Sequence, residues 1–282
     1  MQHHLRPWKL FLQQLSQPEQ KYLASLRGLA RQAPPLGSVA WSCHDLFLGY
    51  LPAQRAALVC NTLPHCRFHG VGLQWDTAHW SRERRSLVLQ EMLLQHKEKG
   101  LLTGWRNESF SFWTTECQDP NPEVPAFLGV ERAGFRYLGM MSHAVHINGF
   151  LPDGRVWCGR RSATKATDPG LLDNVAAGGL PTGETVSHCA LRELGEEAGL
   201  FAVDAINLFD AGFVRTSRNE PEGWHDETLH VLNLVLDEEF VPANQDGEVQ
   251  EFLCLKPPHL LELIRDGKFT LDAIAALVQG FQ

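Results

Sequence analysis

The sequence predicts an α+β protein of two domains, and three observations lead to this prediction. A chain of 282 residues with 44% hydrophobic and 21% charged residues has a globular composition and enough length for two modest domains. Helical and strand patterns are mixed along the chain without strict alternation. A segment with three prolines, residues 114–127, separates two regions of different pattern. We therefore expect an N-terminal domain over residues 1–130 and a second domain over residues 131–282.

The first domain is expected to be a smaller α+β domain. Apolar residues recur at helical spacing over residues 8–31, with a break near Pro18. Residues 46–59 predict a short strand followed by a helix that begins near Pro52, because proline suits the first turn of a helix. A further helix is expected over residues 81–100, where one apolar face is flanked by charges and Gly100 ends the pattern.

The second domain is expected to combine a sheet with helices. Residues 142–162 alternate on both sides of a Pro-Asp-Gly turn, which indicates a hairpin. A helix is predicted from Thr185, which can cap its start, to Gly199, which can end it in the left-handed conformation. Further strands are predicted over residues 207–216, 228–237 and 246–255, and two short helices over residues 257–281.

Charge and composition argue against several kinds of partner. The net charge of -8 does not suit a nucleic-acid surface, which needs clustered lysine and arginine. The apolar runs are far shorter than the roughly 20 residues that span a bilayer, so we expect no membrane partner. Seven cysteines without a C-x-x-C pair suit a reducing compartment, and we expect the cytoplasm. The first residues lack a secretory signal but also lack acids before Glu19, so an organelle-targeting segment stays open. A homodimer is also left open.

The helix over residues 185–199 carries an acidic face. Glu193, Glu196 and Glu197 are three and four residues apart, so they project together. Three like charges on adjacent turns repel, and a hard divalent cation would offset that repulsion. The alternative is a solvated acidic face, which is common on glutamate-rich helices.

The spacing around this helix resembles the box of the Nudix hydrolases. In that family a glycine is followed after five residues by glutamate, and after seven more by Arg-Glu-aliphatic-x-Glu-Glu-x-Gly-aliphatic. This chain has Gly178, then Glu184, and then the run from Arg192 to Leu200, so every defined position matches.

The resemblance implies a Nudix α/β/α sandwich and hydrolysis of a diphosphate linked to another group, with Mg²⁺ or Mn²⁺ as cofactor. Its implied metal ligands are Glu196, Glu197 and the carbonyl of Gly178. Glu193 is implied as a further ligand or as the base that activates water. Arg192 and Glu184 are implied to pair and brace the loop. A bound metal would neutralise diphosphate charge and lower the pKa of its water.

The chain also resembles one Nudix branch, which is related to the Nudix portion associated with thiamine pyrophosphokinase. The segments HINGF, LLDNVAAGG and FVPANQDGEV carry this resemblance, and LTGWRNESFSFW and FLGYLPA extend it into the branch's N-terminal domain. It implies hydrolysis of thiamine diphosphate, or of its oxidised or damaged analogues, to the monophosphate. Two alternatives remain: another nucleoside diphosphate derivative such as ADP-ribose, and a non-catalytic Nudix-fold binding module.

Cations close to the box are candidates for binding the small-molecule diphosphate. Arg160, Arg161 and Lys165 precede the predicted metal loop and could hold phosphate oxygens, unless they are only exposed cations at a strand edge. Glu248 lies where Nudix enzymes often place an extra ligand or base, and Glu251 is the second option.

Four more residues are candidates for contacting the leaving group. His146 and Asn148 alternate with apolar neighbours and would share one face of a strand. Trp224 and His225 lie in a segment that looks like a loop and could stack on an aromatic ring. In contrast, the spacing of Cys60, Cys66 and the histidines beside them matches no zinc pattern.

Overall fold

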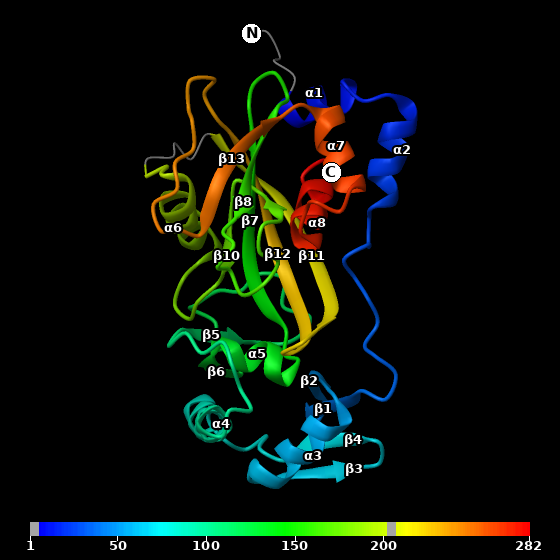
Figure 1. Ribbon diagram of the computed structural model, residues 1–282. Helices are drawn as coiled ribbons and strands as arrows, with labels where there is room; N and C mark the ends of the chain where they lie inside the picture. Colours follow the sequence, from blue (N-terminus) through cyan, green and yellow to red (C-terminus); the bar gives the residue numbers. More distant parts are fainter. Residues whose placement is uncertain (1–5, 202–206) are drawn as a thin grey trace.

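The computed structural model describes residues 6–201 and 207–282, with a long mixed sheet at one end of the molecule and a smaller sheet at the other (Figure 1). The helices are α1 (Pro7–Gln13), α2 (Gln17–Ser25), α3 (Ala53–Thr62), α4 (Arg82–Glu98), α5 (Arg132–Leu138), α6 (Val186–Ala198), α7 (Pro257–Arg265) and α8 (Leu271–Gln279). The strands are β1 (Val39–Cys43), β2 (Leu46–Leu51), β3 (Cys66–His69), β4 (Gly72–Trp75), β5 (Ser109–Phe112), β6 (Leu128–Glu131), β7 (Ser142–Phe150), β8 (Val156–Arg161), β9 (Leu172–Asp173), β10 (Ala176–Gly179), β11 (Leu208–Glu220), β12 (Gly223–Val235) and β13 (Val249–Leu255).

The large sheet has the strand order β11-β12-β7-β8-β13, with β10 paired to β7 and β9 paired to β8. Strand β7 lies at its centre, parallel to β12 and antiparallel to β10 and β8. Helix α6 covers one face, and α7 and α8 lie on the other side (Figure 1). The predicted α+β class and the sandwich of helices around a mixed sheet are therefore observed.

Each face of β7 contributes to a separate apolar core, as strand alternation requires. Ile147 packs with Ala190 and Leu194 of α6. Phe150, near the end of the strand, packs instead with Leu260 of α7 and Leu277 of α8. The box helix is thus fixed against the sheet by its small and apolar stripe, which leaves its acidic residues free to face β10.

The smaller unit has its own sheet and core. Its strands have the order β2-β1-β4-β3, and Trp41 and Trp75 are completely buried among residues of α3 and α4. The β5-β6 hairpin and α5 belong to the same core through Phe112, Val130 and Leu138. These two elements lie between the small sheet and the large one (Figure 1), so they bring the smaller unit next to the large sheet.

The division at residues 130 and 131 does not follow these cores. Phe11, Leu15 and Leu23 of the first helical segment pack with α7 and α8, because that face of the large sheet has apolar surface to cover. Beyond the predicted boundary at residue 130, Met140 and Met141 still belong to the core of the smaller unit. The first helices therefore pack with the second domain, and the smaller unit extends to about residue 141.

Several local predictions are confirmed. Helix α3 follows Pro52, α4 starts after the cap Ser81, and β7 and β8 form the predicted hairpin. The box helix has Thr185 Oγ1 accepting from the His188 N–H at 3.2 Å, and Gly199 ends it with φ of 71°. The loop predicted around Trp224 is wrong, because Trp224 lies within strand β12 of a long hairpin.

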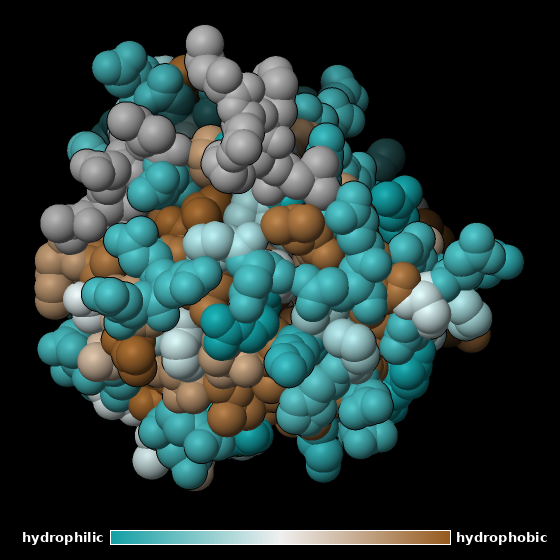
Figure 2. Space-filling view, turned by 90° about the horizontal axis from the view of Figure 1, so that it is seen from above, coloured by the Kyte–Doolittle hydropathy of each residue, from teal (hydrophilic) through white to brown (hydrophobic). Residues whose placement is uncertain are grey.

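The end of the molecule near α1 and α7 has a mainly hydrophilic surface, with small groups of apolar residues between the polar ones (Figure 2). In the part of the chain that the structure describes, no helix is both long and apolar enough to cross a membrane.

Candidate active site

The box helix and strand β10 hold the acidic residues together. Glu193 is buried against Gly178 of β10, where the missing side chain of glycine provides the space for the carboxylate. Any Cβ at position 178 would overlap that carboxylate. Burial raises the pKa of Glu193, while the neighbouring Arg192 opposes this rise. The glycine of the box is thus required by the close approach of a carboxylate.

Arg192 links the acidic residues of the box. Its Nε and Nη2 donate to Glu184 at 3.0 and 3.1 Å, and its Nη1 donates to Glu193 at 2.7 Å and to Glu196 at 3.0 Å. A guanidinium group suits this role because its donors lie in a fixed plane. The pairing of Glu184 with Arg192 is the one expected from the box, and it positions two further carboxylates.

Lys165 joins the box to the loop before β13. Its ammonium contacts Glu248 and lies 3.5 Å from Glu197 Oε1. Burial raises the pKa of Glu197 to about 8, although Lys165 and a hydrogen bond from the Ala177 N–H act in the other direction. Burial also acts against ionisation of Glu248, but the bond from Lys165 holds its pKa below the ordinary value. A positive charge therefore already lies between these two carboxylates.

The register of β10 indicates that the backbone carbonyl of Ala177, rather than the predicted carbonyl of Gly178, is turned away from β7. The Leu180 N–H donates to His143 O of β7. Hydrogen-bonded pairs recur at every second residue of an antiparallel ladder, so the N–H and C=O of Gly178, which pairs with Val145, also point toward β7. Ala177 is turned to the free edge of β10, where its N–H donates to Glu197 Oε2 at 2.9 Å. Its carbonyl points to the same edge.

A cavity of about 570 Å³ lies beside the box and is lined by residues of both units. Glu193, Glu196 and Glu248 contribute to its wall, together with Lys165 and Arg161. This volume is in the range of small-molecule sites. The cavity thus places the box carboxylates and two of the predicted phosphate-binding cations in one space.

Sequence reasoning missed the cations that the smaller unit adds to this cavity. Arg106, Arg132 and Arg136 all line it. Arg106 is held by its N–H bond to the buried Glu131, which also caps α5. No local pattern marks these residues, because they reach the box only through the packing of the hairpin and α5 against the large sheet.

Three predicted site residues lie outside the cavity and are corrected here. Arg160 is on the other side of β8 from Arg161, where it pairs with Glu251 at 2.5 Å. Asn148 is buried behind the sheet and donates to Asn233 at 3.0 Å. Trp224 packs edge to face against Tyr50, with ring centroids 6.3 Å apart.

The remaining candidates line the cavity. His146 is buried and contacts Asn174 Oδ1 through Nδ1 at 2.7 Å. Arg161 donates to Asp173 at 2.7 Å and to the Thr167 carbonyl. His225, predicted together with Trp224, faces the cavity while its neighbour does not, since adjacent residues of a strand point to opposite faces.

Comparison with known proteins agrees with this geometry. The NUDIX domain family model matches residues 143–276. Residues 143–276 are thus similar to a NUDIX domain. The chain is 33% identical over 202 residues to Nudix hydrolase 24, chloroplastic, of Arabidopsis thaliana, covering 71% of this chain and 54% of that protein. It is also 33% identical over 190 residues to Nudix hydrolase 20, chloroplastic, of the same plant, covering 66% of this chain and 49% of that protein. The chain thus spans about half the length of these two relatives.

Among solved structures, the chain is similar to DR0079 from Deinococcus radiodurans, with a TM-score of 0.46 and 20% identity, covering 61% of this chain and 98% of that one.

The residues around the box fit the divalent metal that Nudix hydrolases generally use. Glu193, Glu196 and Glu197 offer carboxylate oxygens, and Ala177 offers a carbonyl oxygen. Such oxygen ligands are those that Mg²⁺ and Mn²⁺ prefer. The ammonium of Lys165 between Glu197 and Glu248 shows that a cation is accommodated there.

Proposed function

We propose that the protein is a metal-dependent hydrolase of a diphosphate linkage, and that it converts thiamine diphosphate, or an oxidised or damaged analogue, to the monophosphate. The observation that supports this proposal is the distribution of charge in one cavity. Lys165 and Arg132 line it near the box, whereas Glu227 and Asp272 line another part, in which Arg218 pairs with Asp272. A substrate with a diphosphate at one end and, beyond it, an organic group that is cationic or donates hydrogen bonds matches this arrangement.

In thiamine diphosphate the positively charged thiazolium ring lies between the diphosphate and an aminopyrimidine whose amino group can donate to a carboxylate. ADP-ribose has no positive charge beside its diphosphate, so it would gain less from the acidic side chains of the cavity. The names of the two plant relatives do not mention thiamine, and the substrate is therefore proposed from the cavity and from the resemblance of the sequence.

In this proposal Glu193, Glu196, Glu197 and the Ala177 carbonyl would hold Mg²⁺ or Mn²⁺. When bound, the metal would offset diphosphate charge and lower the pKa of a water molecule, so that hydroxide is available to attack phosphorus. Arg192 keeps Glu193 and Glu196 in place through its bonds of 2.7 and 3.0 Å. The box residues thus act mainly by positioning oxygen ligands.

Two steps fall to the side chains around the box. Lys165 and Arg161 would bind phosphate oxygens, since both line the cavity and charge-assisted bonds to phosphate are strong. Glu193 and Glu248 are the two candidates for accepting the proton of the attacking water. The low pKa of Glu248, maintained by Lys165, keeps it in the basic form at neutral pH.

The test is a panel of diphosphates incubated with purified protein and Mg²⁺ or Mn²⁺, with products separated by chromatography. The panel contains thiamine diphosphate, its oxidised analogues and ADP-ribose. We expect the largest kcat/KM for a thiamine compound, with thiamine monophosphate as product. A larger kcat/KM for ADP-ribose would refute the substrate, and the absence of any product from the whole panel would favour a non-catalytic binding module.

A further inference from the structure

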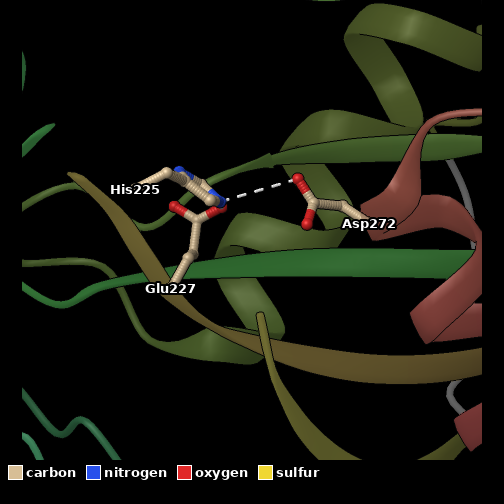
Figure 3. A group of neighbouring side chains, drawn as sticks. All are labelled: His225, Glu227 and Asp272. Atoms are coloured by element: carbon tan, nitrogen blue, oxygen red, sulfur yellow. Dashed lines mark ion pairs between the residues drawn. The ribbon is translucent and has the colours of Figure 1, made fainter. Parts of the chain in front are cut away.

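A second group of polar side chains lines the same cavity, apart from the box. His225 and Glu227 project from β12, and Asp272 projects from the first turn of α8 (Figure 3). One ligand atom of each side chain lies within 4.8 Å of the others. His225 Nε2 is 3.9 Å from Glu227 Oε2 and 3.7 Å from Asp272 Oδ2. These distances are too long for direct hydrogen bonds, so the three groups face a shared space.

The tautomer of His225 is fixed by Arg136. Nη2 of Arg136 lies 3.1 Å from His225 Nδ1, and a guanidinium can only donate a hydrogen bond. Nδ1 must therefore be the acceptor, which leaves the proton of the neutral ring on Nε2. Burial lowers the pKa of His225, although Asp272 and Glu227 oppose this shift, so the neutral form is the relevant one.

His225 is only 4% exposed, and within residues 6–201 and 207–282 its Nε2 has no hydrogen-bond partner. A buried donor without a partner destabilises the folded protein, so such a group is expected to have a partner in the functional state. His225 is one of the residues that line the cavity, so a bound molecule can supply the missing partner.

The two carboxylates are already held by one oxygen each. Ser142 Oγ donates to Glu227 Oε1 at 2.7 Å, and Arg218 Nη1 donates to Asp272 Oδ1 at 2.8 Å. The other oxygens, Oε2 and Oδ2, are those nearest to His225 Nε2. The cluster therefore presents one N–H donor beside two fixed acceptors.

This pattern does not suit a metal ion. To bind a metal, Nε2 would have to offer a lone pair, and the ring proton would move to Nδ1. That proton would then face the N–H of Arg136, and two donors would oppose each other at 3.1 Å. A molecule that accepts one hydrogen bond and donates the neighbouring one satisfies all three side chains without this conflict.

We propose that His225, Glu227 and Asp272 bind the heterocycle of the substrate through a ring nitrogen and the amino group next to it. The ring nitrogen accepts from His225 Nε2–H, and the amino group donates to the carboxylates. This inference rests on the proposed diphosphate hydrolysis and extends it to the organic part of the substrate. The aminopyrimidine of thiamine has the required edge, and so does the adenine of ADP-ribose.

The separation of the two parts of the cavity allows one molecule to reach both. Gly178 pairs with Val145, and Glu227 pairs with Ser142, on opposite sides of β7. With strands about 4.8 Å apart and a rise of about 3.3 Å per residue, the Cα atoms of Gly178 and Glu227 are roughly 14 Å apart. Gly178, His225 and Glu227 line the same cavity, so a single substrate can reach both the box and the cluster.

The experiment compares amino substrates with their oxo analogues. Oxythiamine diphosphate and IDP-ribose carry a carbonyl oxygen in place of the amino group, which reverses the donor and acceptor positions. We expect kcat/KM of the wild type for the amino compound to exceed that for its oxo analogue by about 100-fold or more. With the oxo analogue, a ring N–H would face the N–H of His225, and a carbonyl oxygen would face the carboxylates, so neither hydrogen bond could form. Both pairs are measured, so the comparison holds whichever compound the protein cleaves.

Glu227→Gln tests the assignment of the acceptor. The amide of glutamine can donate to a carbonyl oxygen, so the amino-to-oxo ratio should fall at least about tenfold, through KM of the amino compound more than through kcat. Asp272→Asn is the second variant if Glu227→Gln does not fold. Glu222→Gln is the matched control, since Glu222 lines the cavity outside the cluster and the ratio should be unchanged.

Three results decide the proposal. A wild-type ratio near one would overturn it, and so would a ratio that Glu227→Gln leaves unchanged. If the wild type cleaves neither pair, the proposed function fails. The heterocycle site is then tested by equilibrium dialysis of thiamine and oxythiamine. Tighter binding of thiamine than of oxythiamine, with this preference lost in Glu227→Gln, supports the site. Equal binding of the two compounds by the wild type overturns it.

Discussion

Substitution of Gly178 by alanine tests the contact between strand β10 and the box helix. An added Cβ would lie 2.6 Å from Glu193 Oε2 and closer still to Oε1 and the carboxyl carbon. To reach an ordinary contact of 3.4 Å, the carboxylate has to move by about 1 Å or more. The atoms displaced are at the end of a flexible side chain, so the fold should tolerate the change.

The expected loss of activity follows from this displacement. A misplacement of about 1 Å in a catalytic arrangement can cost about 100-fold in rate, which corresponds to about 3 kcal/mol of activation free energy. We therefore expect kcat of Gly178→Ala for the preferred diphosphate to fall about 100-fold. The midpoint of thermal unfolding should stay within a few degrees of the wild type.

Gly129→Ala is the matched control. Gly129 also lies in a strand, but its nearest neighbour for an added Cβ is the Phe110 carbonyl at 3.4 Å, and no box carboxylate is close. Activity of this variant should be unchanged.

A double-variant cycle shows whether the effect passes through Glu193. Glu193→Asp shortens the side chain, so Gly178→Ala should cost much less in that background than in the wild type. Full activity of Gly178→Ala, or a cycle in which the two losses simply add, would refute the reasoning.

The remaining predictions concern the brace, the buried histidines and the metal. Glu184→Gln removes the charged partner of Arg192 and should lower kcat about tenfold or more by loosening Glu193 and Glu196; equal kcat values for variant and wild type would contradict this role. Burial lowers the pKa of His143 to about 3 and of His230 to about 4. The unfolded chain therefore takes up protons that the folded protein does not, and the free energy of unfolding should fall below about pH 6.5 by about 1 kcal/mol per pH unit for each histidine. Denaturant titrations from pH 7 to 5 measure how the free energy of unfolding changes with pH, and His230→Phe should reduce this slope. A slope that His230→Phe leaves unchanged would contradict a lowered pKa of His230. Chelation of divalent metal should abolish hydrolysis and Mg²⁺ or Mn²⁺ should restore it, whereas turnover that persists in excess chelator would rule out the metal.

The box and its helix could be predicted from the sequence because their signals are local. Thr185 and Gly199 mark the ends of α6, and the spacing from Glu184 to Arg192 lets the two side chains meet across the loop and first turns. The class of the fold also follows from local periodicity. These features depend on residues that are close in the chain.

The rest of the cavity depends on packing between distant segments. Arg106 and Arg132 reach it only because the β5-β6 hairpin and α5 lie against the large sheet. Asp272 meets His225 because α8 packs on the far side of that sheet. His225 lines the cavity and Trp224 does not, because the two residues lie on opposite faces of β12. A segment that is interpreted as a loop does not predict which side chain points to which face. Such contacts are set by tertiary structure, which the pattern of one segment does not contain.

The most direct test of the central claim compares the wild type with Glu197→Gln in the hydrolysis of thiamine diphosphate with Mg²⁺. Burial already disfavours the charged form of Glu197, so the neutral glutamine should leave the fold and its unfolding midpoint intact. Removal of a carboxylate ligand should nevertheless reduce the release of thiamine monophosphate at least about 100-fold. We predict this loss in a folded variant. Undiminished release by folded Glu197→Gln protein would contradict the assignment of the box as the site of diphosphate hydrolysis.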